Sequence, residues 1–80
     1  MKVVKKLKNL KLNKKYRIKN IIEGEAGIGT RMMQLGFISG EDLTLIRRAP
    51  LFGEPLLVEV RGSQFAISRA EAELIEIEED

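Results

Sequence analysis

The chain has 80 residues, of which 44% are hydrophobic and 32% charged; its formal net charge is +2, and it contains neither cysteine nor histidine. This length predicts a single domain over residues 1–80, with one modest core and no room for a deep substrate cleft. The lack of thiol and imidazole groups excludes disulfides, thiolate or imidazole metal ligands and the common nucleophile–base pairs of enzymes.

The first element is a basic N-terminal segment, residues 1–15. Residues 1–20 carry nine basic side chains and no acid, whereas residues 69–80 carry six acids and one arginine. One interpretation is a surface for an anionic partner: nucleic acid, an anionic membrane face or an acidic protein. The other, which we favour, is that the lysines are solvated and that the two ends attract each other when the terminal strands pair. No apolar run approaches the roughly 20 residues of a membrane span, so we expect a cytoplasmic protein, free or at the inner face of the membrane.

The next stretch raises the question of a nucleotide site. Residues 15–22 place apolar side chains among basic ones and predict a strand. Gly24 and Gly29 then have the spacing of a phosphate-binding P-loop, but Thr30 stands where that loop needs its lysine. A P-loop also needs a parallel sheet, whereas the strands predicted downstream are joined by tight turns. We therefore interpret Gly24, Gly27 and Gly29 as structural turns that let the chain reverse close to its own core.

A short helix is predicted after these glycines. Ile28, Met32 and Leu35 are spaced to line one helical face, which predicts that Met32 and Leu35 are buried. Gly36 stands where a left-handed residue would end the helix. Phe37 is then placed to fold back on Met32, as in a Schellman ending.

The rest of the chain predicts strands. Partial alternation of apolar and polar residues occurs at residues 42–48, 56–62, 64–68 and 74–79. Gly62 and Ser63 predict a two-residue hairpin with glycine first, and residues 69–73 predict a single helical turn before the last strand. The sequence thus predicts a mainly β fold, a small five-stranded antiparallel β-barrel with one short α-helix, because closure removes exposed sheet edges.

The loop between two of these strands, within residues 47–57, is a candidate contact. Pro50 and Pro55 stiffen it, and its tip offers Leu51 and Phe52. Proline lowers the entropy cost of presenting such a loop to a partner. Two roles stay open for the tip: contact with another protein, or a lid folded inward over the core.

Metal binding is restricted by the composition. Without histidine or cysteine, a site would use carboxylates, carbonyl oxygens or Gln34, and the thioethers of Met32 and Met33 would favour a soft ion. Methionines at this spacing are more often core residues than ligands. We therefore assign no metal site and expect no cofactor, beyond weak binding of Fe2+ or another divalent ion.

Several motifs in order resemble the ferrous iron transport protein A (FeoA) family, over residues 7–78. The resemblance rests on the glycine-bearing loop, Arg31, Leu35-Gly36, Gly40, Arg48-Ala49-Pro50-Leu51, Gly53, Pro55, Val60-x-Gly62, Ala66 and Arg69-x-Glu71-Ala72-x-x-Ile75. The opening LKNLKLNKKYRI is also similar to the first segment of that family, with Asn13 where glycine is usual. Asparagine tolerates a left-handed backbone, so the turn is expected to persist.

The resemblance implies an SH3-like barrel beside a ferrous iron (Fe2+) uptake system, whose permease is a membrane protein with a cytosolic guanine-nucleotide-binding domain. It implies an accessory protein rather than an enzyme, acting as a protein-interaction module on the cytosolic part of that permease. From the predicted helix and loop, we expect the partner contact at Arg31, Met33, Gln34, Leu51 and Phe52. Two alternatives stay open: a transition-metal-sensing SH3-like domain, and a nucleic-acid-binding small barrel, which the few scattered aromatic residues support poorly. We expect neither nucleic acid nor a small-molecule substrate as the partner.

Overall fold

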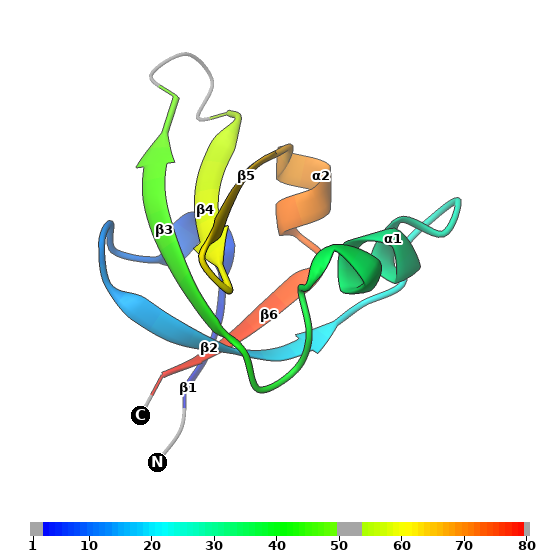
Figure 1. Cartoon of the computed structure of the whole chain (residues 1–80), viewed down its shortest axis with the longest axis horizontal. Helices are drawn as coiled ribbons and strands as arrows, with labels where there is room; N and C mark the ends of the chain where they lie inside the picture. The colour runs from blue at the N-terminus through cyan, green and yellow to red at the C-terminus, as the bar shows by residue number, and fades with distance from the viewer. Residues whose placement is uncertain (1–2, 50–53, 80) are drawn as a thin grey trace.

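The computed structural model describes residues 3–49 and 54–79 (Figure 1). Its elements follow in chain order as β1 (Val3–Lys6), the 3-10 turn η1 (Leu7–Asn9), β2 (Lys15–Ile21), α1 (Ile28–Leu35), β3 (Asp42–Arg48), β4 (Leu56–Val60), β5 (Ser63–Ile67), α2 (Arg69–Ala72) and β6 (Ile75–Glu79). The predicted mainly β fold, with one short helix and a helical turn before the last strand, is confirmed. Neither helix of the described stretches has the length and apolar character needed to cross a membrane.

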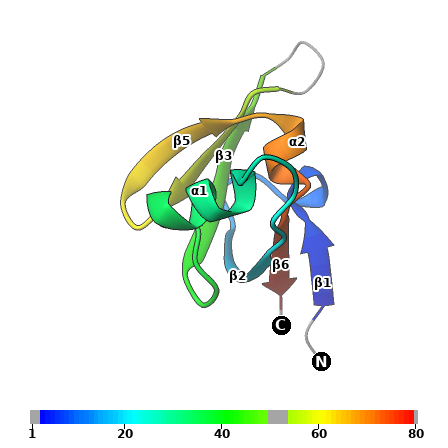
Figure 2. The same ribbon diagram turned by 90° about the vertical axis from the view of Figure 1, so that its right-hand side faces the viewer.

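The six strands form one antiparallel sheet in the order β1-β6-β2-β3-β4-β5, which differs in two details from the predicted five-stranded closed barrel. The extra strand is β1, whose backbone pairs with β6 from Val3 opposite Glu79 to Lys6 opposite Glu76. Four residues that include two lysines carry little strand signal of their own, so this pairing decides the strand. Within residues 3–49 and 54–79, no ladder joins β1 to β5, so the sheet stays unclosed. Figures 1 and 2 show both helices on the side of the molecule between β5 and β6.

The core lies on the concave side of the sheet. In β2, for example, Tyr16 and Ile18 are buried while Lys15 and Arg17 are exposed, as strand alternation requires. Phe37 is fully buried behind α1, and its ring centroid lies 5.1 Å from that of Phe65 on β5. The largest fully buried side chains are Leu7, Ile18, Met32, Phe37, Leu43, Leu45, Val58, Val60, Ile75 and Ile77.

The hairpin between β4 and β5 is shifted by one residue from its prediction. Val60 pairs with Ser63, so the two loop residues are Arg61 and Gly62 rather than Gly62 and Ser63. Both have positive φ, 55° at Arg61 and 81° at Gly62. A loop with two left-handed residues matches the right-handed twist of the strands, and glycine takes its second position here.

The two ends of the chain attract each other as predicted. The Lys5 Nζ lies 2.7 Å from the Glu79 carboxylate, and Lys14 pairs with the same group. The Lys6 ammonium donates a 2.9 Å hydrogen bond to the Glu73 carbonyl. Three lysines of the basic N-terminal segment, Lys5, Lys6 and Lys14, are therefore bonded to the C-terminal part of the chain.

Candidate functional site

The glycine loop between β2 and α1 closes around Glu23. This carboxylate accepts a 2.6 Å hydrogen bond from the Thr30 hydroxyl and a 3.2 Å bond from the Thr30 N–H. These two bonds hold the pKa of Glu23 below its usual range, and the bond from the hydroxyl has the larger effect. Thr30 stands at the start of α1, where a P-loop would present backbone N–H groups to a phosphate. The chain's own carboxylate thus occupies the place that a nucleotide phosphate would take.

The glycines of this loop serve two different geometries. Gly24 and Gly27 have φ of 69° and 71°, in the left-handed region that the reversal of the chain requires. Gly29 lies in the first turn of α1 instead, and a Cβ built on it would sit 2.6 Å from both the Glu23 Cα and the Ile22 carbonyl oxygen. The absence of a side chain at Gly29 therefore lets the helix start directly against the end of β2.

Helix α1 covers the core with a narrow stripe. The stripe runs through Gly29 and Met32, both buried. The helix ends as predicted: Gly36 is left-handed with φ of 118°, and the Phe37 N–H donates a 3.1 Å hydrogen bond to the Met32 carbonyl. The predicted burial of Leu35 is wrong, since its side chain is 54% exposed. Each step of three residues turns about 60° around a helix, so Leu35 lies beyond the edge of a stripe centred between Gly29 and Met32.

The predicted contact residues of α1 are all exposed, but they do not share one face. Arg31, Gln34 and Leu35 are spaced by three and four residues and lie side by side. Met33 is 40% exposed and lies on the opposite flank of the helix. Two exposed apolar residues were not among those expected at the contact: Leu35, and Ile38 just after the helix, which is 42% exposed. Sequence pattern alone assigns Leu35 to the core, and nothing in it distinguishes Ile38 from a buried residue.

The other predicted contact residues, Leu51 and Phe52, lie outside the described residues. The described ends of their loop are joined by a 3.1 Å hydrogen bond from the Ala49 N–H to the Pro55 carbonyl. In Figures 1 and 2, α1 is separated from the ends of β3 and β4 that lead into this loop. The helix and the loop would therefore form two contacts rather than one continuous surface.

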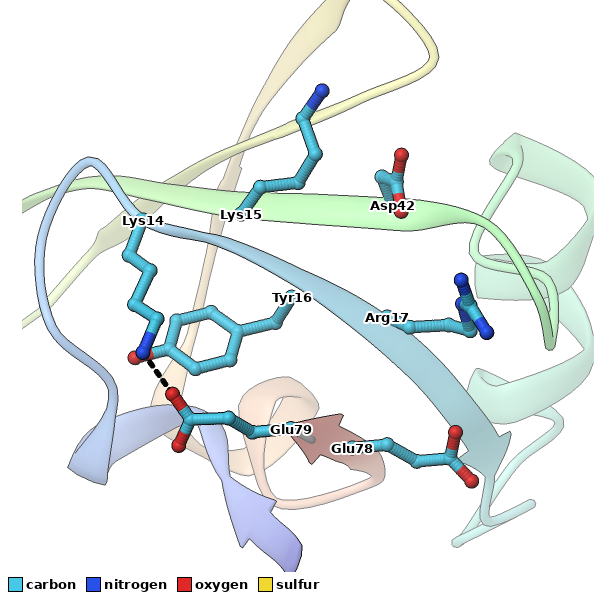
Figure 3. Close-up of a pocket in the computed structure, with 7 residues that line it drawn as sticks. All are labelled: Lys14, Lys15, Tyr16, Arg17, Asp42, Glu78 and Glu79. Atoms are coloured by element: carbon cyan, nitrogen blue, oxygen red, sulfur yellow. Dashed lines mark hydrogen bonds and ion pairs between the residues drawn. The ribbon is translucent and has the colours of Figure 1, made fainter. Parts of the chain in front are cut away.

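A shallow hollow of about 300 Å³ lies on the outer face of the sheet (Figure 3). It is lined by Lys14, Lys15, Tyr16, Arg17, Asp42, Glu78 and Glu79. Two of its cations, Lys15 and Arg17, lie on β2 and the third, Lys14, directly precedes it; its three acids come from β3 and β6, the strands on either side of β2. Because cations and acids alternate around the hollow, it has no cluster of like charges that would bind an anion or a cation.

Glu79 is the centre of this charge network. Hydrogen bonds from Lys14 and then Lys5 lower its pKa to about 2. The same bond with Glu79 raises the pKa of Lys14, whose ammonium also lies 5.4 Å from the centre of the Tyr16 ring. The network links β1, the residue before β2, and β6, and so joins the two ends of the chain.

Metal ligands do not converge in the described part of the chain. Across residues 3–49 and 54–79, no three acidic side chains are grouped as they would need to be to hold an ion. A specific metal site therefore has no support from this geometry.

Comparison with known proteins gives one family and several similar structures. The family model described as FeoA domain matches residues 5–79. No curated protein matches the chain. Among solved structures, the FeoA protein of Stenotrophomonas maltophilia, complexed with zinc, is 31% identical with a TM-score of 0.80; the match covers 91% of this chain and 88% of that one. That protein is described as a prokaryotic SH3 domain protein and a candidate activating factor of bacterial ferrous iron transport.

Two further structures have the same fold. The FeoA protein of Chlorobium tepidum is 33% identical with a TM-score of 0.80, and the match covers 91% of this chain and 68% of that one. The iron(II) transport protein A of Clostridium thermocellum is 30% identical with a TM-score of 0.82, and the match covers 92% of this chain. This chain spans only 44% of that structure's length. The unclosed six-stranded sheet is accordingly an SH3-like fold.

Proposed function

This chain belongs to the FeoA domain family, whose members are linked to ferrous iron transport, and on that premise we propose that it is an accessory protein that docks on the cytosolic part of a ferrous iron permease. The family match over residues 5–79 is the observation that carries this proposal. The zinc-bound relative supports it, because it is described as a candidate activating factor of such transport. The proposed mode of action is binding, through groups already on the surface of the domain.

The exposed face of α1 is the main contact that we propose. Arg31 offers a guanidinium for a carboxylate of the partner, Gln34 offers an amide, and Leu35 offers an apolar side chain beside them. An arginine next to an exposed apolar residue is a common composition for the centre of a protein interface. Met33, on the opposite flank of the helix, would then extend this contact, and the loop with Leu51 and Phe52 would form a second, separate contact.

Both ends of α1 are fixed, which favours its exposed face as a docking surface. The Glu23 cap fixes the first turn of α1, and the Gly36 ending fixes its last turn. The side chains between them are therefore presented without the entropy cost of ordering a loop. Docking at α1 also leaves the sheet and its charge network unchanged.

Chemical-shift perturbation tests the proposal. The isotope-labelled chain is titrated with the cytosolic domain of the permease, and the amide shifts of Arg31, Gln34 and Leu35 are expected to change most. Absence of any shift at saturating partner would overturn docking itself. Shifts confined to β1 and β6 would overturn the assignment to α1 and leave docking intact. A parallel titration with Fe2+ alone tests the metal-sensing alternative, which predicts localised changes without the partner.

A further inference from the structure

Arg61 stands in an unfavourable backbone position. It is the first residue of the two-residue loop between β4 and β5, and its φ is 55°. A left-handed backbone brings the Cβ of most residues too close to the following carbonyl oxygen, so asparagine, aspartate or glycine usually takes this position. An arginine here therefore lowers the stability of the fold relative to asparagine.

The arginine side chain does not offset this cost within the domain. Arg61 is exposed, and in the described part of the chain its guanidinium takes part in no hydrogen bond or ion pair. This holds although three acids line a hollow together with Arg61, namely Glu41, Asp42 and Glu59. Backbone strain of this kind gathers at binding and catalytic sites, where a function maintains it.

The Arg61 side chain lies against the C-terminal end of α1. A Cβ built on Gly36 would sit 3.5 Å from the Arg61 Cδ. Gly36 directly follows Leu35, the exposed last residue of α1, and Figure 2 shows the β4–β5 hairpin beside this end of the helix. A cation is favoured near the C-terminus of a helix, but across residues 3–49 and 54–79 the guanidinium donates to no carbonyl. Its donors are therefore unbonded at the end of the helix that we propose for docking.

We propose that Arg61 is a contact residue for the partner and that it binds a carboxylate of an acidic segment. This inference rests on the proposed docking at α1, and it adds the β4–β5 hairpin to that surface. Residues 26–40 and 60–70, which supply the helix and the hairpin, contain no acid. Arg31 on α1 is likewise without an ion pair among the described residues, so the surface offers two guanidinium groups to a partner that carries acids. A guanidinium pairs with a carboxylate through two parallel hydrogen bonds, which orients the partner as well as binding it.

Two measurements on Arg61→Asn test the inference. Asparagine tolerates the left-handed backbone, so the midpoint of thermal unfolding is expected to rise by about 4 °C. Binding to the cytosolic domain of the permease, measured by calorimetry, is expected to weaken about tenfold, because a charge-assisted contact is lost. Arg61→Lys keeps both the charge and the unfavourable backbone. It is expected to leave the midpoint unchanged and to weaken binding only about threefold, through loss of the paired hydrogen bonds.

Arg17→Gln is the matched control, since it removes the same charge from an exposed position in the regular strand β2. It is expected to change neither measurement. Unchanged binding of Arg61→Asn would overturn the inference, and docking at α1 would still stand if Arg31→Glu weakened binding. A midpoint that did not rise would also overturn it, because Arg61 would then support the fold as well as asparagine does. If the unchanged chain did not bind the domain at all, the proposed function would fail, and Arg61 would have no such partner.

Discussion

The Thr30 hydroxyl lies 2.6 Å from the Glu23 carboxylate, seven residues back along the chain. This contact explains why a glycine spacing that resembles a nucleotide site forms a structural turn. The helix N-terminus has partial positive charge and free N–H groups, which favour an anion. Here the anion is part of the polypeptide, and it fixes the loop between β2 and α1.

Replacing Glu23 with glutamine is expected to loosen this loop and lower the midpoint of thermal unfolding. Glutamine keeps an acceptor oxygen but loses the charge that strengthens both bonds to Thr30. Hydrogen exchange of the Thr30 amide is expected to become faster in the variant. Glu25→Gln, an exposed acid in the same loop, is the control and is expected to leave both values unchanged. Equal effects of the two substitutions would show that loop charge, rather than the cap, is responsible.

Gly29→Ala is expected to destabilise the fold by about 1–3 kcal/mol, the cost of overpacking a tight contact. In an open helix the same change would stabilise by nearly 1 kcal/mol, so the sign of the effect is diagnostic. The reason is the 2.6 Å approach of the Glu23 Cα to the position of the new Cβ. Denaturant unfolding measures the difference.

Gly27→Ala serves as the comparison for that experiment. Nothing lies within 4 Å of a Cβ at Gly27, so only its left-handed φ of 71° opposes the substitution. We expect a cost of about 1 kcal/mol from that backbone strain. A stabilising Gly29→Ala would contradict the close packing of α1 on the end of β2.

Stability is expected to fall as the pH is lowered from about 4.5, the ordinary pKa of the Glu79 carboxyl, to about 2, its pKa in the fold. A group whose pKa is lower in the folded state stabilises the fold above its unfolded pKa and loses that contribution as it is protonated. Glu23 acts in the same direction. Glu79→Gln should therefore lower stability at neutral pH and flatten this acid limb in pH-dependent unfolding. If Glu79→Gln lost stability at acid pH as the unchanged chain does, the acid sensitivity would come from other carboxyl groups.

Charge reversal on α1 tests the proposed docking face. Arg31→Glu and Leu35→Ala are each expected to weaken binding to the cytosolic domain of the permease by about 1–3 kcal/mol, measured by calorimetry. Met33→Ala is expected to have a smaller effect, because Met33 lies on the other flank of the helix. Leu51→Ala combined with Phe52→Ala tests the separate loop contact. Lys19→Gln, on the sheet, is the control that should bind normally.

Local rules predicted the elements that depend on neighbouring residues. The end of α1 at Gly36 follows from a glycine at the place where the helix needs a left-handed residue, and the structure has that geometry. Asn13 similarly stands in a left-handed turn, with φ of 61°. The sequence pattern did not predict β1, because a short lysine-rich stretch becomes a strand only by pairing with β6 at the other end of the chain.

The sequence by itself determined five of the six strands, the short helix and the family, since each of these rests on residue types at fixed spacings. Only the tertiary structure decided that Leu35 is exposed, that Glu23 fills the start of α1, and that β1 pairs with β6. Spacing along a helix fixes which residues share a face, but the neighbour packed against it decides how wide the buried stripe is. Contacts between residues far apart in the chain depend on sheet register, which alternation along a single strand does not specify.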